Sequence, residues 1–263
     1  MFSTFSNCIS QCREHATTLM ESLPSLCPMC QLPQSGSLIC QYCFSILTAT
    51  EQGCFQCAEP LPKSIKIVVS IHGCNSPIFC GRCQNTPPWF DRVIAQLAYQ
   101  EPLSKLIQGY KFANQLNLLP SLSECLIQQI QSVRDKGYQL PDALIAVPLH
   151  PQRLRQRGFN QSLLLANRVS KHLKIPLLNS LILRIKNTGD QASLNRKQRK
   201  SNIYKAFQIS PSNKIDLSQI NKIAIIDDVI TSGNTCNELA RILKKAGITF
   251  VDIWCIAKTP FIK

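Results

Sequence analysis

Ile223-Ala-Ile-Ile-Asp-Asp-Val-Ile-Thr-Ser-Gly-Asn-Thr235 is the most informative stretch of the chain. An apolar run leads into two adjacent carboxylates, a short loop with hydroxyls and one glycine, and then a segment with helical spacing. In an open α/β sheet, ligands bind at the carboxyl ends of the strands, and the free N–H groups at the start of a helix suit a phosphate. The stretch therefore predicts a strand, a phosphate-binding loop and a helix, in that order.

The side chains of this stretch suit the parts of a phosphorylated sugar. Adjacent carboxylates accept hydrogen bonds from a vicinal diol, and the loop offers hydroxyl donors around a glycine that lets the backbone approach a ligand closely. A surface turn capped by Asp228 is the alternative interpretation. We expect the binding residues to be Asp227, Asp228, Thr231, Ser232, Gly233, Asn234 and Thr235.

The same stretch resembles the type I phosphoribosyltransferases. Every one of its positions is compatible with the signature by which that family binds phosphoribosyl pyrophosphate (PRPP). The resemblance implies that Asp227 and Asp228, as the catalytic residues, take the 2′- and 3′-hydroxyls of the ribose. It also implies that Thr231 to Thr235 cradle the 5′-phosphate and that Mg²⁺ accompanies PRPP.

The segments around this stretch alternate between strand and helix patterns. Continuous apolar strands that alternate with helices indicate a parallel sheet covered on both faces. We therefore predict an α/β fold, similar to the type I phosphoribosyltransferases, with a parallel sheet flanked by helices. Strands are expected at residues 143–147, 223–226 and 250–257, and helices at 160–173 and 234–246.

The cysteines and prolines divide the chain into regions. Two adjacent prolines, Pro87 and Pro88, indicate an extended connector, and helical spacing follows from Phe90 to about Val133. The predicted regions are an N-terminal extension (1–22), a double zinc ribbon (23–86), and a phosphoribosyltransferase-like domain (90–263) made of a helical segment (90–135) and a core (140–263).

A basic segment, Pro148-Leu-His-Pro-Gln-Arg-Leu-Arg-Gln-Arg-Gly-Phe-Asn-Gln161, follows the first predicted core strand. It looks like the hallmark of the ComF/GntX family, the competence-associated phosphoribosyltransferase-like proteins, which also carry an N-terminal cysteine ribbon. Trp89-Phe90-Asp91-Arg92 and Lys111-Phe112 are similar to the same family, so the resemblance runs from about Cys27 to Lys258.

The type I resemblance also implies a second phosphate element. In that family the loop after the first core strand contacts the pyrophosphate, and the matching positions run from Leu149 through His150 to Arg153. Arg157 stands next to a glycine and just before a predicted helix, so it is an expected anion site independently of the resemblance. A solvated, basic start of a helix is the alternative interpretation.

A second basic segment extends from residue 184 to residue 205, with Asp190 as its one acid. Within it, Gln191 to Asn202 looks like the ComF/GntX version of the mobile loop that closes over PRPP in the enzymes, where cations stabilise the departing pyrophosphate. A surface that binds the backbone of a nucleic acid is the competing interpretation. The residues concerned are Arg184, Lys186, Arg196, Lys197, Arg199, Lys200 and Lys205.

Eleven of the fourteen cysteines fall within the first 83 residues, and eight of these form CxxC pairs. Zinc prefers four thiolates in a tetrahedron, and each CxxC turn presents two of them. We predict two structural zinc ions and prefer pairing in sequence order, with crossed pairing left open. The two sets are Cys27, Cys30, Cys40 and Cys43, and Cys54, Cys57, Cys80 and Cys83; Cys8, Cys12 and Cys74 have no assigned role.

The chain has 29 basic and 15 acidic groups, with four of each in residues 1–90, so the net charge of +14 belongs to residues 91–263. An anionic partner is therefore expected at the second region. No run approaches the length of about 18 apolar residues that a bilayer demands, and the first 20 residues lack the apolar core of a signal peptide. We expect a cytoplasmic protein without membrane insertion, recruited to the inner face of the membrane.

Three functions are consistent with these features. The ComF resemblance implies a role in natural transformation and DNA uptake, in which single-stranded DNA is handled on a PRPP-binding fold beside the competence helicase and DNA-processing proteins. The second hypothesis is an active PRPP-dependent phosphoribosyltransferase with an unknown acceptor. The third is a PRPP-sensing regulator without turnover.

Overall fold

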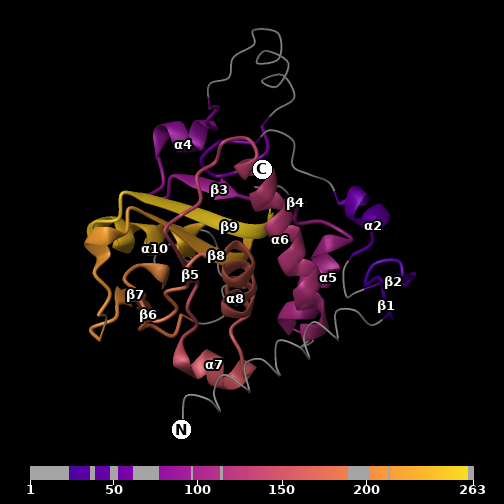
Figure 1. The fold of residues 1–263 in the computed structure, drawn as a ribbon. Helices are drawn as coiled ribbons and strands as arrows, with labels where there is room; N and C mark the ends of the chain where they lie inside the picture. The colour runs from indigo at the N-terminus through magenta and orange to yellow at the C-terminus, as the bar shows by residue number, and fades with distance from the viewer. Residues whose placement is uncertain are drawn as a thin grey trace.

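The computed structural model describes residues 24–35, 39–47, 53–61, 77–95, 97–112, 115–188, 202–212 and 214–259 (Figure 1). Its centre is a parallel sheet with the strand order β3-β9-β8-β5, and β4 also pairs with β9. The predicted α/β fold with a parallel sheet is confirmed. The strands are β3 (Arg92–Ile94), β4 (Leu97–Ala98), β5 (Ala143–Ala146), β8 (Lys222–Ile230) and β9 (Phe250–Lys258).

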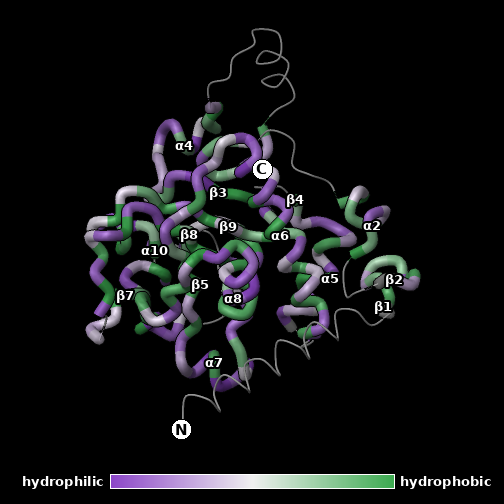
Figure 2. Tube along the Cα trace, viewed as in Figure 1, coloured by the Kyte–Doolittle hydropathy of each residue, from purple (hydrophilic) through white to green (hydrophobic). Residues whose placement is uncertain are grey.

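The two faces of the sheet carry separate apolar cores because successive side chains of a strand point to opposite faces. Ala224 and Ile226 of β8 join the core under α5, α6 and α8, whereas Ile223 and Ile225 join the core under α10. Figure 2 shows β3 and β9 as hydrophobic tubes inside the molecule and α7 as mostly hydrophilic at its edge. The helices are α5 (Leu103–Phe112), α6 (Leu119–Arg134), α7 (Pro151–Arg157), α8 (Gln161–Leu173) and α10 (Asn234–Lys245), with 3-10 turns η1 (Leu116–Leu118) and η3 (Leu217–Gln219).

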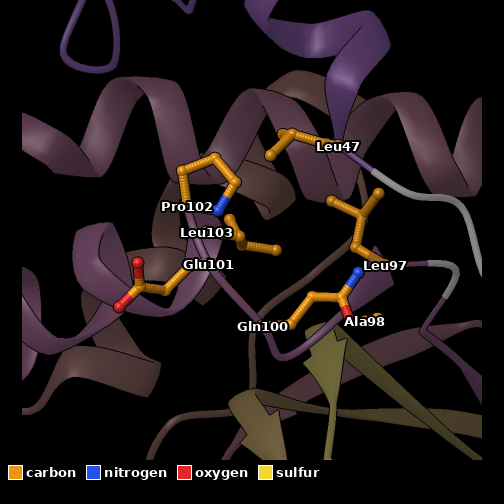
Figure 3. A pocket seen from close by; sticks show the side chains of 7 residues that line it. All are labelled: Leu47, Leu97, Ala98, Gln100, Glu101, Pro102 and Leu103. Atoms are coloured by element: carbon orange, nitrogen blue, oxygen red, sulfur yellow. The ribbon is translucent and has the colours of Figure 1, made fainter.

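Smaller elements surround this core. An antiparallel pair, β6 (Ile182–Arg184) with β7 (Phe207–Ile209), lies beside the sheet. The cysteine region forms β1 (Pro24–Leu26), β2 (Pro33–Ser35), α2 (Gln41–Ile46) and α4 (Gly81–Asn85). Figure 3 shows Leu47, just after α2, beside Leu97 and Leu103, and all three belong to one apolar core, so an apolar contact joins the first cysteine set to the α5 side of the sheet.

Three expectations were wrong in detail. Residues 92–94 and 97–98 are strands and not helix, because Val93, Ile94 and Leu97 pair with β9. The spacing of apolar residues by three and four positions does not reveal this pairing. The segment expected as a loop after β5 becomes α7 at Pro151, since His150 caps the helix and a proline suits its first position. Strand β8 continues through both acids to Ile230, because that residue is buried and pairs with Lys258.

Candidate ligand site and cysteine clusters

The two acids lie in the last part of β8, inside the strand and not after it. Asp227 Oδ1 accepts a hydrogen bond from Ser162 Oγ at 2.9 Å and another from the backbone N–H of Asp228 at 3.0 Å. Asp228 is only 4% exposed, and its Oδ1 lies 2.8 Å from Lys111 Nζ and 2.7 Å from the N–H of Val229. Helices α5 and α8 thus bring one partner each to the acid pair.

The pKa of Asp227 differs from that of an exposed carboxyl because the pair is buried. Burial, and next the adjacent charge of Asp228, raise the pKa of Asp227 to about 7, although Lys111 and Ser162 act in the opposite direction. Burial disfavours the charge on Lys111, but the carboxylates of Asp228 and Asp227 raise its pKa overall. A proton or a cation is therefore favoured between these side chains at neutral pH.

The loop after β8 has the features of an anion seat. Gly233 adopts φ = 74°, in the left-handed region that favours glycine, and immediately precedes α10. The Nδ2 of Asn234 is buried and has no hydrogen-bond partner among the described residues. A buried donor without a partner costs free energy, so an acceptor that arrives at this loop would be stabilised.

One of the predicted cations, Arg184, interacts electrostatically with Asp227. Burial lowers the pKa of Arg184 to about 10, the charge of Arg153 adds to this effect, and Asp227 opposes it. Arg184 donates to Thr188, while its Nε is buried without a partner in the described part of the chain. A hollow of about 460 Å³ has Leu149, His150 and Arg184 in its lining, whereas Arg153, the two acids and the loop 231–235 do not line it.

The remaining predicted site residues have other surroundings. His150 Nδ1 accepts the N–H of Gln152 at 3.3 Å and so serves the start of α7. Arg157 ends α7 beside Gly158. Lys186 donates to the carbonyl of Tyr204 at 3.0 Å, on the exposed side of β6. The predicted loop residues Arg196, Lys197, Arg199 and Lys200, as well as Cys8, Cys12 and Cys74, lie outside the described residues.

The CxxC pairs assemble into two groups of four thiols in sequence order, which confirms the preferred pairing. The sulfur atoms of each group lie within 4.8 Å of one another. Tetrahedral zinc with Zn–S distances of about 2.3 Å has sulfur–sulfur edges of about 3.8 Å. Cys30 and Cys40 are 3.7 Å apart at Sγ, as are Cys57 and Cys80, so both groups could hold structural zinc.

Proton sharing within the clusters agrees with this interpretation. A hydrogen bond from Cys57 lowers the pKa of Cys54 to about 4, whereas burial acts in the other direction. The same bond and burial raise the pKa of Cys57, and burial raises that of Cys83 to about 12. Four thiols this close do not all ionise without a cation, and a divalent ion bound by four thiolates removes the conflict.

Comparison with known proteins places the chain. Residues 160–260 match the phosphoribosyl transferase domain family. Competence protein F of Haemophilus influenzae is 37% identical over 180 residues, which cover 68% of this chain and 78% of that protein. DNA utilization protein YhgH of Escherichia coli K12 is 32% identical over 243 residues, covering 91% of this chain and 100% of that protein. The chain belongs to the ComF family.

A more distant relative, competence protein ComFC of Bacillus subtilis, is 24% identical over 239 residues, which cover 84% of this chain and 90% of that protein. None of the helices in the described ranges of this ComF protein has the length and hydrophobicity that crossing a bilayer requires.

Sequence reasoning missed two polar residues of the ComF site. Ser162 and Lys111 contact the acids from α8 and α5, 65 and 117 positions away. The Lys111-Phe112 pair was visible only as a family resemblance, because one lysine at the end of an amphipathic helix has no local signal of a role. Tyr110 fixes this helix end by donating to the carbonyl of Gln161 at 2.9 Å.

Proposed function

We propose that this protein acts in DNA uptake and handles single-stranded DNA on a fold that binds PRPP with Mg²⁺. The arrangement at the carboxyl end of β8 carries the proposal. Two acids and a glycine loop with an unpartnered buried donor lie there, and the charge of Arg184 interacts with Asp227 and with Arg153. A ribose with phosphates on both sides requires diol acceptors, an anion seat and a cationic neighbour, and these three features supply them.

Each residue then has a defined part in binding. Asp227 and Asp228 accept the ribose hydroxyls, and the loop 231–235 offers its N–H groups and hydroxyls to the 5′-phosphate. Carboxylate oxygens are also ligands that Mg²⁺ prefers, and the ion would neutralise charge on the pyrophosphate. Lys111 balances Asp228 until the ligand arrives, because a buried carboxylate without a partner is costly.

The DNA part of the proposal rests on relatives and on charge. The relatives are named as competence and DNA utilization proteins. The net charge of +14 lies in residues 91–263. Arg153, Arg155 and Arg157 belong to α7, and Asn187, which follows Lys186, donates to Gln152 of the same helix at 2.7 Å. Such a surface binds the phosphate backbone with an affinity that falls as salt rises.

The setting follows from the same role. We place the protein in the cytoplasm at the inner face of the membrane, with the competence helicase and DNA-processing proteins as partners. We propose the regions 1–22, 23–86 and 90–263 as its organisation, and Arg196, Lys197, Arg199 and Lys200, which lie between β6 and β7 in the sequence, as cations that contact phosphate.

Phosphoribosyl transfer is a second candidate, favoured by the position of Arg184. Its charge interacts with Arg153 and Asp227, where a departing pyrophosphate would need cations. Asp227 and Asp228 would then hold the ribose while its C1–oxygen bond breaks. The acceptor would be identified by product analysis with labelled PRPP.

Calorimetry with PRPP and Mg²⁺, followed by a salt series of single-stranded DNA binding on the same sample, tests the proposal. We expect PRPP binding that Asp227→Asn and Asp228→Asn abolish, and DNA binding that weakens with salt but survives both substitutions. PRPP consumption by the unmodified protein would favour the transferase. Absence of both PRPP and DNA binding would refute the proposed function.

A further inference from the structure

The second cysteine cluster, formed by Cys54, Cys57, Cys80 and Cys83, shares an apolar core with the phosphate loop. Three of its cysteines are buried in the same core as Phe90, Ile230 and Cys236. A Cβ on Gly233 would lie 3.6 Å from Ile230 Cδ1 and 3.8 Å from the Phe90 ring, so these side chains support the loop directly. The first cluster packs instead against the core on the opposite face of the sheet.

A buried ion pair makes the first polar connection. Lys258, the last residue of β9, is 2% exposed, and its Nζ lies 3.1 Å from Glu59 Oε2. The same Nζ donates to the carbonyl of Thr231 at 3.5 Å and to that of Thr259 at 3.2 Å. Glu59 lies two residues after Cys57. It therefore holds the ammonium group of Lys258, which contacts Thr231, the first residue of the phosphate loop.

A chain of hydrogen bonds makes the second connection. Gln56, in the turn between Cys54 and Cys57, donates to the carbonyl of Phe90 at 2.9 Å. The backbone N–H of the neighbouring Trp89 donates to Asn237 Oδ1 at 2.7 Å, in the first turn of α10. The turn of residues 54–59 is thus connected to the loop 231–235 on its strand side through Lys258 and on its helix side through Asn237.

We propose that the second cysteine cluster is a positioning element of the ribose-phosphate site and acts on the loop 231–235 through Glu59 and Gln56. The consequence for ligand binding rests on the proposed function. A metal held by the four thiols orders the turn 54–59, which fixes Lys258 and Phe90 against the loop. Metal occupancy of this cluster and PRPP binding then strengthen each other, because such coupling is reciprocal.

Glu59→Gln tests the connection while all eight thiols remain. Amide hydrogen exchange of the peptide spanning residues 231–237 is measured without ligand, and PRPP affinity is measured by calorimetry on the same zinc-loaded protein. We expect faster exchange in this peptide and PRPP binding weakened by about tenfold, which is about 1.4 kcal/mol and less than the usual cost of a buried charge that loses its partner. Glu101→Gln, which removes the exposed 2.9 Å pair with Lys105, is the matched control.

A second pair of variants compares the clusters. Cys57→Ser and Cys30→Ser should each lose one zinc ion per chain, but only Cys57→Ser should speed exchange in the loop. In the unmodified protein, PRPP should slow zinc release to a chromogenic chelator from the second cluster alone. A purely structural role would change global unfolding without this selective protection.

The outcomes separate the two ideas. Exchange in residues 231–237 that Glu59→Gln leaves at the unmodified rate overturns the inference, whether or not PRPP binds. If the unmodified protein does not bind PRPP while Glu59→Gln still loosens the loop, the ribose-phosphate function fails and the positioning role stands. If Cys57→Ser does not fold, Glu59→Gln decides alone.

Discussion

Asp227→Asn should make the protein more stable while it abolishes PRPP binding. Burial and Asp228 raise the pKa of Asp227 in the folded chain to about 7 from 3.8. An acid with a raised pKa binds its proton more tightly when folded, so its contribution to stability is lost as pH rises from about 4 to about 7. Asparagine removes this titration, and its amide oxygen can still accept the hydrogen bond from Ser162.

The size of the effect follows from the shift. A difference of about three pKa units corresponds to about 4 kcal/mol above pH 7, and the same linkage gives about half of that at pH 5.5. Any loss from the amide itself is the same at each pH. The stability of Asp227→Asn relative to the unmodified protein should therefore rise by about 2 kcal/mol between pH 5.5 and pH 8.

Urea unfolding of zinc-loaded protein at several pH values is the assay. Asp216→Asn is a control of opposite sign, because hydrogen bonds from Ser218 lower the pKa of Asp216. If the stability difference between Asp227→Asn and the unmodified protein does not change with pH, the argument that folding raises the pKa of Asp227 is refuted. If Asp227→Asn abolishes PRPP binding and increases stability, Asp227 serves ligand binding at the expense of stability.

Three further results are expected. Lys111→Met should cost about 2–3 kcal/mol in urea unfolding, because Asp228 is left buried without its cation, and adding Asp228→Asn should recover part of that loss in a double-mutant cycle. Gly233→Ala should weaken PRPP binding in calorimetry and cost about 1 kcal/mol of stability, since φ = 74° disfavours a side chain although a Cβ would meet Ile230 and Phe90 only at ordinary van der Waals distances. Lys186→Ala should reduce the slope of log affinity for single-stranded DNA against log salt by about 0.7 if this lysine meets one phosphate.

Local pattern predicted much of the architecture. The apolar runs at residues 143–147 and 250–257 are strands within one residue of their expected ends, and the helix from Asn234 follows the glycine loop as expected. The pattern failed at residues 92–98, where the spacing of Val93, Ile94 and Leu97 fits a helix as well as a strand. Pairing with β9, more than 150 residues later, selected the strand.

The sequence by itself determined the parallel sheet, the acid pair with its glycine loop, and the two sets of four cysteines, because hydrophobic period, loop composition and CxxC spacing are local properties. Only the tertiary structure decided that Lys111 meets Asp228, that the thiols group in sequence order, and that Glu59 reaches Lys258 beside the phosphate loop. These contacts join residues far apart in the chain. Their geometry depends on how the sheet and helices pack, which no short window of sequence contains.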